Sequence, residues 1–93
     1  MSKKQFSSVW DAIEDTPEEA ENMKLRSSLM MALKAHMERV GLTQSDAAKL
    51  FGVSQPRVSD LVRGKINLFG LDALVNMATA AGLRVEMTVQ EVA

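Results

Sequence analysis

Hydrophobic residues recur at helical spacing through most of the chain. The stretch 16–40 begins with Thr-Pro-Glu-Glu, in which Thr16 can cap a helix that Gly41 can end. Its apolar stripe is expected to comprise Met23, Met30, Leu33, Met37 and Val40. Three further helices are predicted over 43–51, 54–63 and 71–81, each followed by a glycine that can close it. The pattern therefore predicts an all-α domain over 16–82 with four helices, or five if residues 1–15 are ordered.

Near the end of the chain, in residues 83–93, the helical spacing gives way to strict alternation. The alternating apolar positions are Leu83, Val85, Met87 and Val89. This period predicts a half-buried β-strand. Because no other stretch can pair with it, we expect the same strand of a second copy to do so, which would make the protein a homodimer. An antiparallel register centred on Val85 would set Arg84 opposite Glu86.

The leading residues 1–15 carry apolar side chains on one helical face. These side chains are Phe6, Val9, Trp10 and Ile13, and acidic residues lie between and after them. Two interpretations remain open. The aromatic residues can pack on the body of their own domain, or the segment can dock on a basic protein partner and fold as it binds.

Residues 43–64 have the organisation of two short helices joined by a tight turn. Thr43 and Ser54 can cap the two helices, and Gly52 can supply the positive φ that the turn between them requires. Ala48 is small enough for the helices to approach closely. The inward stripe of the second helix is expected to be Val58, Leu61 and Val62. Its opposite face is polar and able to reach the edges of DNA bases.

The spacing of these residues resembles that of the phage-repressor and Cro-like, XRE-type family of DNA-binding domains. The shared features are Thr43-Gln44 at the first helix start, Ala48 four residues before Gly52, and Val58 and Leu61 six and nine residues after it. Over its whole length the chain is most similar to the HigA-type antitoxins within that family. The resemblance implies a lambda-repressor-like fold of four to five helices with a C-terminal dimerisation β-strand.

The same resemblance implies two sets of DNA contacts. Bases would be read by Gln55, Pro56, Ser59 and Asp60, with Ser54 and Arg57 as further candidates. Phosphates would be held by Thr43, Gln44, Arg63, Lys65 and Asn67. Pro56 departs from the polar residue common in phage repressors and can offer only an apolar contact. Asp60 can accept a hydrogen bond from cytosine but would repel a phosphate.

These features favour a dimeric transcriptional repressor that binds double-stranded DNA at an inverted-repeat operator. The resemblance further implies an antitoxin that represses its own operon and neutralises a small basic ribonuclease. Two alternatives remain open. One is a prophage-type repressor with no toxin partner, and the other is an interaction adaptor whose helix-turn-helix does not bind DNA.

Charge first argues against nucleic-acid binding, because the 93-residue chain has a net charge of −1 and a pI near 5.8. The distribution changes this conclusion, since residues 1–22 carry −4 whereas residues 23–93 carry +3. With no cysteine, no tyrosine and one histidine, we expect neither an enzyme nor a metal or cofactor site. No apolar run suits a membrane span or a signal peptide, so a cytoplasmic location is expected.

Overall fold

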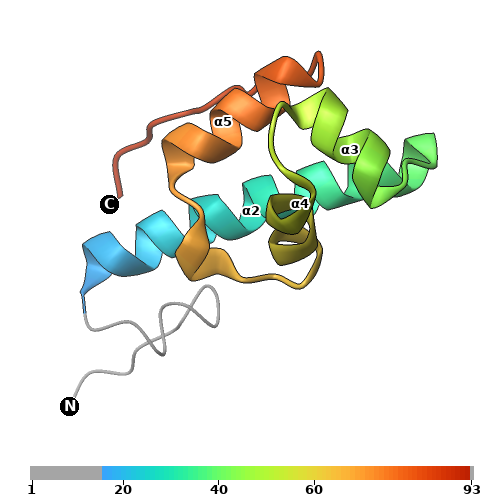
Figure 1. Cartoon of the computed structure of the whole chain (residues 1–93). Helices are drawn as coiled ribbons and strands as arrows, with labels where there is room; N and C mark the ends of the chain where they lie inside the picture. The colour runs from blue at the N-terminus through green and yellow to red at the C-terminus, as the bar shows by residue number, and fades with distance from the viewer. Residues whose placement is uncertain (1–15, 93) are drawn as a thin grey trace.

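The computed structural model describes residues 16–92, in which shorter helices pack against one long helix (Figure 1). Its elements are α2 (Pro17–Val40), α3 (Gln44–Phe51), α4 (Gln55–Val62), the 3-10 helix η1 (Ile66–Leu68) and α5 (Leu71–Ala80). The four predicted helices are thus confirmed. The predicted apolar face of Phe6, Val9, Trp10 and Ile13 lies outside the described residues. Among those described, no helix is long and apolar enough to cross a membrane.

Each of the first three helices begins at a side chain that accepts a hydrogen bond from the first turn. The Thr16 hydroxyl accepts from the Glu19 amide at 3.1 Å, and the Thr43 hydroxyl accepts from the Asp46 amide at 3.0 Å. The Ser54 hydroxyl accepts at 3.3 Å from the third residue of α4. These contacts satisfy amides that have no acceptor within the helix, so the predicted caps are confirmed.

The turn between α3 and α4 depends on one glycine. Gly52 adopts φ +72°, in the left-handed region, and its amide donates to the Ala48 carbonyl. The next amide, that of Val53, donates to the same carbonyl at 3.0 Å. A residue with a Cβ would be strained at this φ, and the chain would leave α3 in another direction. The turn therefore sets the angle at which α4 crosses α3.

One hydrophobic core joins all four α-helices. Its buried members are Met30, Leu33, Met37, Ala47, Ala48, Phe51, Val58, Leu61, Phe69, Leu74, Met77 and Ala78. Val62 packs against this core from the side, as expected. The expectation that Val40 is buried is wrong, because its side chain is 55% exposed. Met37 is the last buried residue of α2, so the core ends before Val40.

The C-terminal segment, residues 83–92, forms no β-strand in the part of the chain that the structure describes. It turns back after α5, where the Leu83 amide donates to the Ala78 carbonyl at 2.9 Å (Figure 1). Leu83 and Val85 pack on the core, whereas Met87 and Val89 are 66% and 88% exposed. The predicted dimerisation strand is therefore not supported, since a ladder requires a second strand and residues 16–92 supply none.

Candidate nucleic-acid interface

Helix α4 separates an apolar side from a polar side as its sequence predicted. Val58 and Leu61 are buried at 0% and 1% exposure against the other helices. Gln55 and Pro56 are exposed at the start of α4, Ser59 is half-buried, and Arg63 is exposed just after the last turn. The helix thus presents a short polar surface, and the remaining candidate residues lie at its margins.

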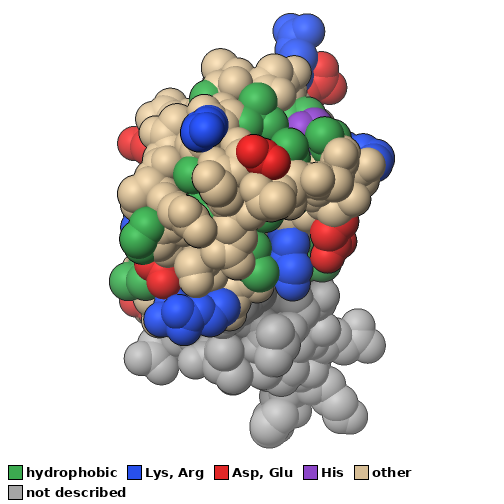
Figure 2. All heavy atoms as spheres, turned by 45° about the vertical axis from the view of Figure 1, so that its right-hand side comes forward, with side chains coloured by type: hydrophobic (Ala, Val, Ile, Leu, Met, Phe, Trp, Pro, Cys, Tyr) green, Lys and Arg blue, Asp and Glu red, His purple; other side chains and the backbone are tan. Residues whose placement is uncertain are grey.

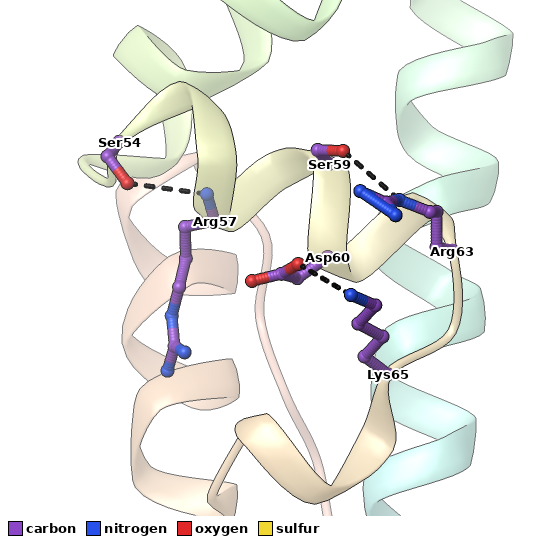
Figure 3. A network of polar contacts seen from close by, with 6 residues as sticks. All are labelled: Ser54, Arg57, Ser59, Asp60, Arg63 and Lys65. Atoms are coloured by element: carbon purple, nitrogen blue, oxygen red, sulfur yellow. Dashed lines mark hydrogen bonds and ion pairs between the residues drawn. The ribbon is translucent and has the colours of Figure 1, made fainter.

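Arg57 does not lie on this outward surface. Its guanidinium carbon is 4.2 Å from the centroid of the Phe69 ring, and Phe69 is only 1% exposed. A cation over an aromatic face is held by the ring quadrupole. Figure 3 shows the Arg57 side chain pointing away from Ser59 and Arg63. The structure therefore places this candidate base reader beside the loop before α5, where it braces α4.

Two further polar pairs occupy the second half of α4 (Figure 3). Asp60 and Lys65 form an ion pair of 3.7 Å between Oδ1 and Nζ, with side chains 25% and 46% exposed. The Lys65 amide also donates to the Asp60 carbonyl at 3.0 Å, so both side chains leave the same turn. The Ser59 hydroxyl accepts a hydrogen bond from Nε of Arg63 at 3.4 Å. Partly exposed contacts of this kind contribute at most about 1 kcal/mol each, so a DNA phosphate can displace them.

The proposed phosphate contacts come from three separate places. Thr43 and Gln44 lie at the start of α3, where unpaired helix amides favour an anion. Arg63 and Lys65 follow the end of α4. Asn67 lies in η1 and lines a hollow together with the carboxylates of Glu18 and Glu19. Arg26 also lines this hollow and only partly offsets the two carboxylates, so the surroundings of Asn67 attract a phosphate weakly.

Positive charge is thinly spread over one face of the molecule. On the face drawn in Figure 2, Lys and Arg side chains are separated by acidic and hydrophobic ones and do not merge into one basic patch. Attraction of DNA to that face would depend on a few individual cations. Asp60 reduces the local field further, because it lies beside Lys65.

Sequence reasoning did not identify Phe69 as part of this site. It is twelve residues from Arg57, so no helical or strand spacing connects them. Residues 16–92 contain no cluster of three His, Cys, Asp or Glu side chains that could bind a metal ion. The single histidine, His36, lies 3.2 Å from Nη2 of Arg39, through its Nδ1.

Comparison with known proteins agrees with this geometry. A family model described as a helix-turn-helix domain matches residues 12–90. A solved structure whose name describes a transcriptional regulator of the XRE family is 32% identical, with a TM-score of 0.72, over 78% of this chain and 82% of that chain. The search of curated proteins found no match. The chain therefore belongs to the XRE-type helix-turn-helix family and is a DNA-binding transcriptional regulator.

Proposed function

We propose that this regulator is a homodimeric repressor of an inverted-repeat operator and the antitoxin of a type II toxin–antitoxin pair that represses its own operon. The observation that carries the operator proposal is the exposed polar surface of α4. Gln55 has an accessible amide at the start of this helix, beside Pro56 and Ser59. An amide side chain can make two hydrogen bonds to adenine in the major groove, and Pro56 can contact a thymine methyl group.

The small size of the reading surface supports the proposal of a dimer. One eight-residue helix can contact only a few base pairs. Two copies related by a two-fold axis would place their α4 helices in successive major grooves, about 34 Å apart. The operator would then be an inverted repeat.

Selection of duplexes from a random DNA pool tests this proposal. The purified full-length protein should enrich an inverted repeat whose half-sites lie about one helical turn apart. Binding to the selected site should fall steeply with salt, because phosphate contacts release counterions. Enrichment of isolated half-sites would contradict the dimer, and no enrichment at low salt would contradict operator recognition.

The antitoxin proposal is supported by the charge of the first 22 residues, which include the first turns of α2. Residues 1–22 carry −4, which suits a basic protein partner, and residues 1–11 precede the part of the chain that matches the family model. The partner would be a small basic ribonuclease masked by residues 1–22. Trp10 is the largest apolar side chain there, although it lies outside the described residues.

Coexpression with the product of the adjacent reading frame tests the antitoxin role. The regulator should relieve growth arrest caused by that product. Trp10→Ala should weaken the complex at least tenfold in a titration and leave DNA affinity unchanged, whereas Lys65→Ala should do the reverse. A Trp10→Ala protein that unfolds on its own would show instead that Trp10 belongs to the core.

A further inference from the structure

An open and mainly apolar groove runs between α2 and the C-terminal segment. Its apolar lining comes from Leu29, Ala32 and Ala35 of α2 and from Leu83 and Val85 of the C-terminal segment, and the charged residues Arg39, Arg84 and Glu86 also line it. Ala32 and Ala35 are exposed, and their small side chains leave the groove unfilled. The groove therefore offers apolar surface that residues 16–92 of a single chain do not cover.

The C-terminal segment beside this groove has backbone groups that are free to pair with a second strand. No backbone hydrogen bond joins residues 84–92 to the rest of the described chain. Extended backbone of this kind is a template for a second strand. Met87 lies on the same face of the alternating pattern as Leu83 and Val85, yet it is 66% exposed.

We propose that the groove receives the partner's Met87 when two copies pair their C-terminal segments antiparallel about Val85. This inference rests on the homodimer proposed above and assigns its interface. In that register the partner's Met87 lies opposite Leu83, on the face that Leu83 turns toward the core. Leu83 is itself part of the groove wall, so the partner's methionine enters the groove. An unbranched thioether side chain adapts readily to a cleft of irregular shape.

Charge selects this register over its neighbours. Arg84 and Glu86 are 3.9 Å apart within one chain, and their side chains are 87% and 81% exposed. Pairing about Val85 puts each Arg84 opposite the partner's Glu86, so the interface has two matched pairs. A shift of the centre to Arg84 or Glu86 would instead place like charges opposite each other, which destabilises paired strands.

A single introduced cysteine tests the register, because the natural chain has none. In an antiparallel pair, directly opposed Cα atoms are about 4.5–5.5 Å apart, within the range that a disulfide bridges. Full-length Val85→Cys should therefore form a covalent dimer on mild oxidation. Thr88→Cys should remain monomeric under denaturing electrophoresis, because it lies six residues out of register with its counterpart.

Sedimentation equilibrium tests the occupant of the groove. Met87→Ser should raise the dimer dissociation constant at least tenfold, while the matched Thr88→Ser, whose side chain faces away, should leave it unchanged. Because Met87 is mostly exposed in one chain, its replacement should not change the unfolding temperature of the monomer.

The outcomes separate this interface from the dimer itself. A wild-type dimer that resists Met87→Ser and does not crosslink through Val85→Cys would overturn this interface and leave the homodimer in place. Crosslinking without an effect of Met87→Ser would overturn the groove as its receptor. A wild-type protein that is monomeric at all concentrations, and selects no inverted repeat, would overturn the proposed homodimer as well.

Discussion

At the residue scale, the side chains of α4 differ in whether they already contact other side chains of the protein. Arg57 is held on Phe69, Asp60 is paired with Lys65, and Ser59 accepts from Arg63. Gln55 lies ahead of these contacts and is exposed at the helix start. Together with Pro56, it is a candidate base reader that can reach DNA without first breaking a side-chain contact within the described chain.

Replacing Gln55 with alanine should therefore reduce sequence discrimination rather than overall attraction. We expect Gln55→Ala to weaken binding to the selected operator by about 1–3 kcal/mol and to leave binding to a scrambled duplex nearly unchanged. Fluorescence anisotropy on both duplexes measures the difference. Asn76→Ala, on the exposed side of α5, is the control and should change neither affinity. Equal losses on both duplexes would contradict a base-reading role.

Changes to the Asp60–Lys65 ion pair should alter affinity for all DNA sequences rather than sequence discrimination. Asp60→Asn should free Lys65 and raise affinity for all duplexes up to about fivefold, the equivalent of ~1 kcal/mol for an exposed ion pair. Lys65→Ala should lower affinity for all duplexes alike and reduce the salt slope by about one. Titrations at several salt concentrations measure both. A loss confined to the operator in Asp60→Asn would show that the carboxylate reads a base.

At the element scale, the helices follow from short-range features of the chain. Thr16, Thr43 and Ser54 each accept an amide hydrogen three residues ahead, so the caps can be predicted within a window of four residues. The turn at Gly52 could be predicted for the same reason, because its need for a positive φ depends only on neighbouring residues. The polar surface of α4 was predictable for this reason, because helical period alone separates it from the buried side.

Contacts between distant positions were not predictable in this way. Arg57 was expected to contact DNA, but its position depends on Phe69, which packing brings over from the loop before α5. The exposure of Val40 depends on where the neighbouring helices end, which no pattern within α2 records. The alternation after Gly82 predicted a strand that the described chain does not form, because a strand needs a second strand to pair with. In each case the missing information lies in the tertiary or quaternary arrangement.

Removal of the side-chain cap of α4 should lower the stability of the protein. Ser54→Ala should lower the free energy of unfolding by about 1 kcal/mol, because the amide that donates to its hydroxyl loses its acceptor. Urea denaturation measures the change. The matched control is Ser45→Ala, in the first turn of α3, where the serine is exposed and does not cap the helix. If the two variants lose equal stability, the Ser54 contact contributes nothing specific.

At the scale of the whole molecule, the proposed second copy would pair with the C-terminal segment, which has no pairing strand within one described chain. Truncation after Gly82 removes the unpaired segment, including Leu83 and Val85, which cover part of the core. We expect the truncated protein to sediment as a monomer and to lose preference for paired half-sites over single ones. Circular dichroism verifies that its helices remain. A folded truncated protein that stays dimeric would remove the basis for pairing through this segment.

The eight-residue length of α4 also limits how much sequence one subunit can distinguish. If its exposed turns read about four base pairs, a matching half-site occurs by chance roughly once in 256 positions, and a paired site roughly once in 65,000. A genome offers about 10⁶ or more competing positions, so even a dimer meets many accidental matches. A regulator with so little information in its reading helix is suited to controlling a single promoter close to where it is synthesised.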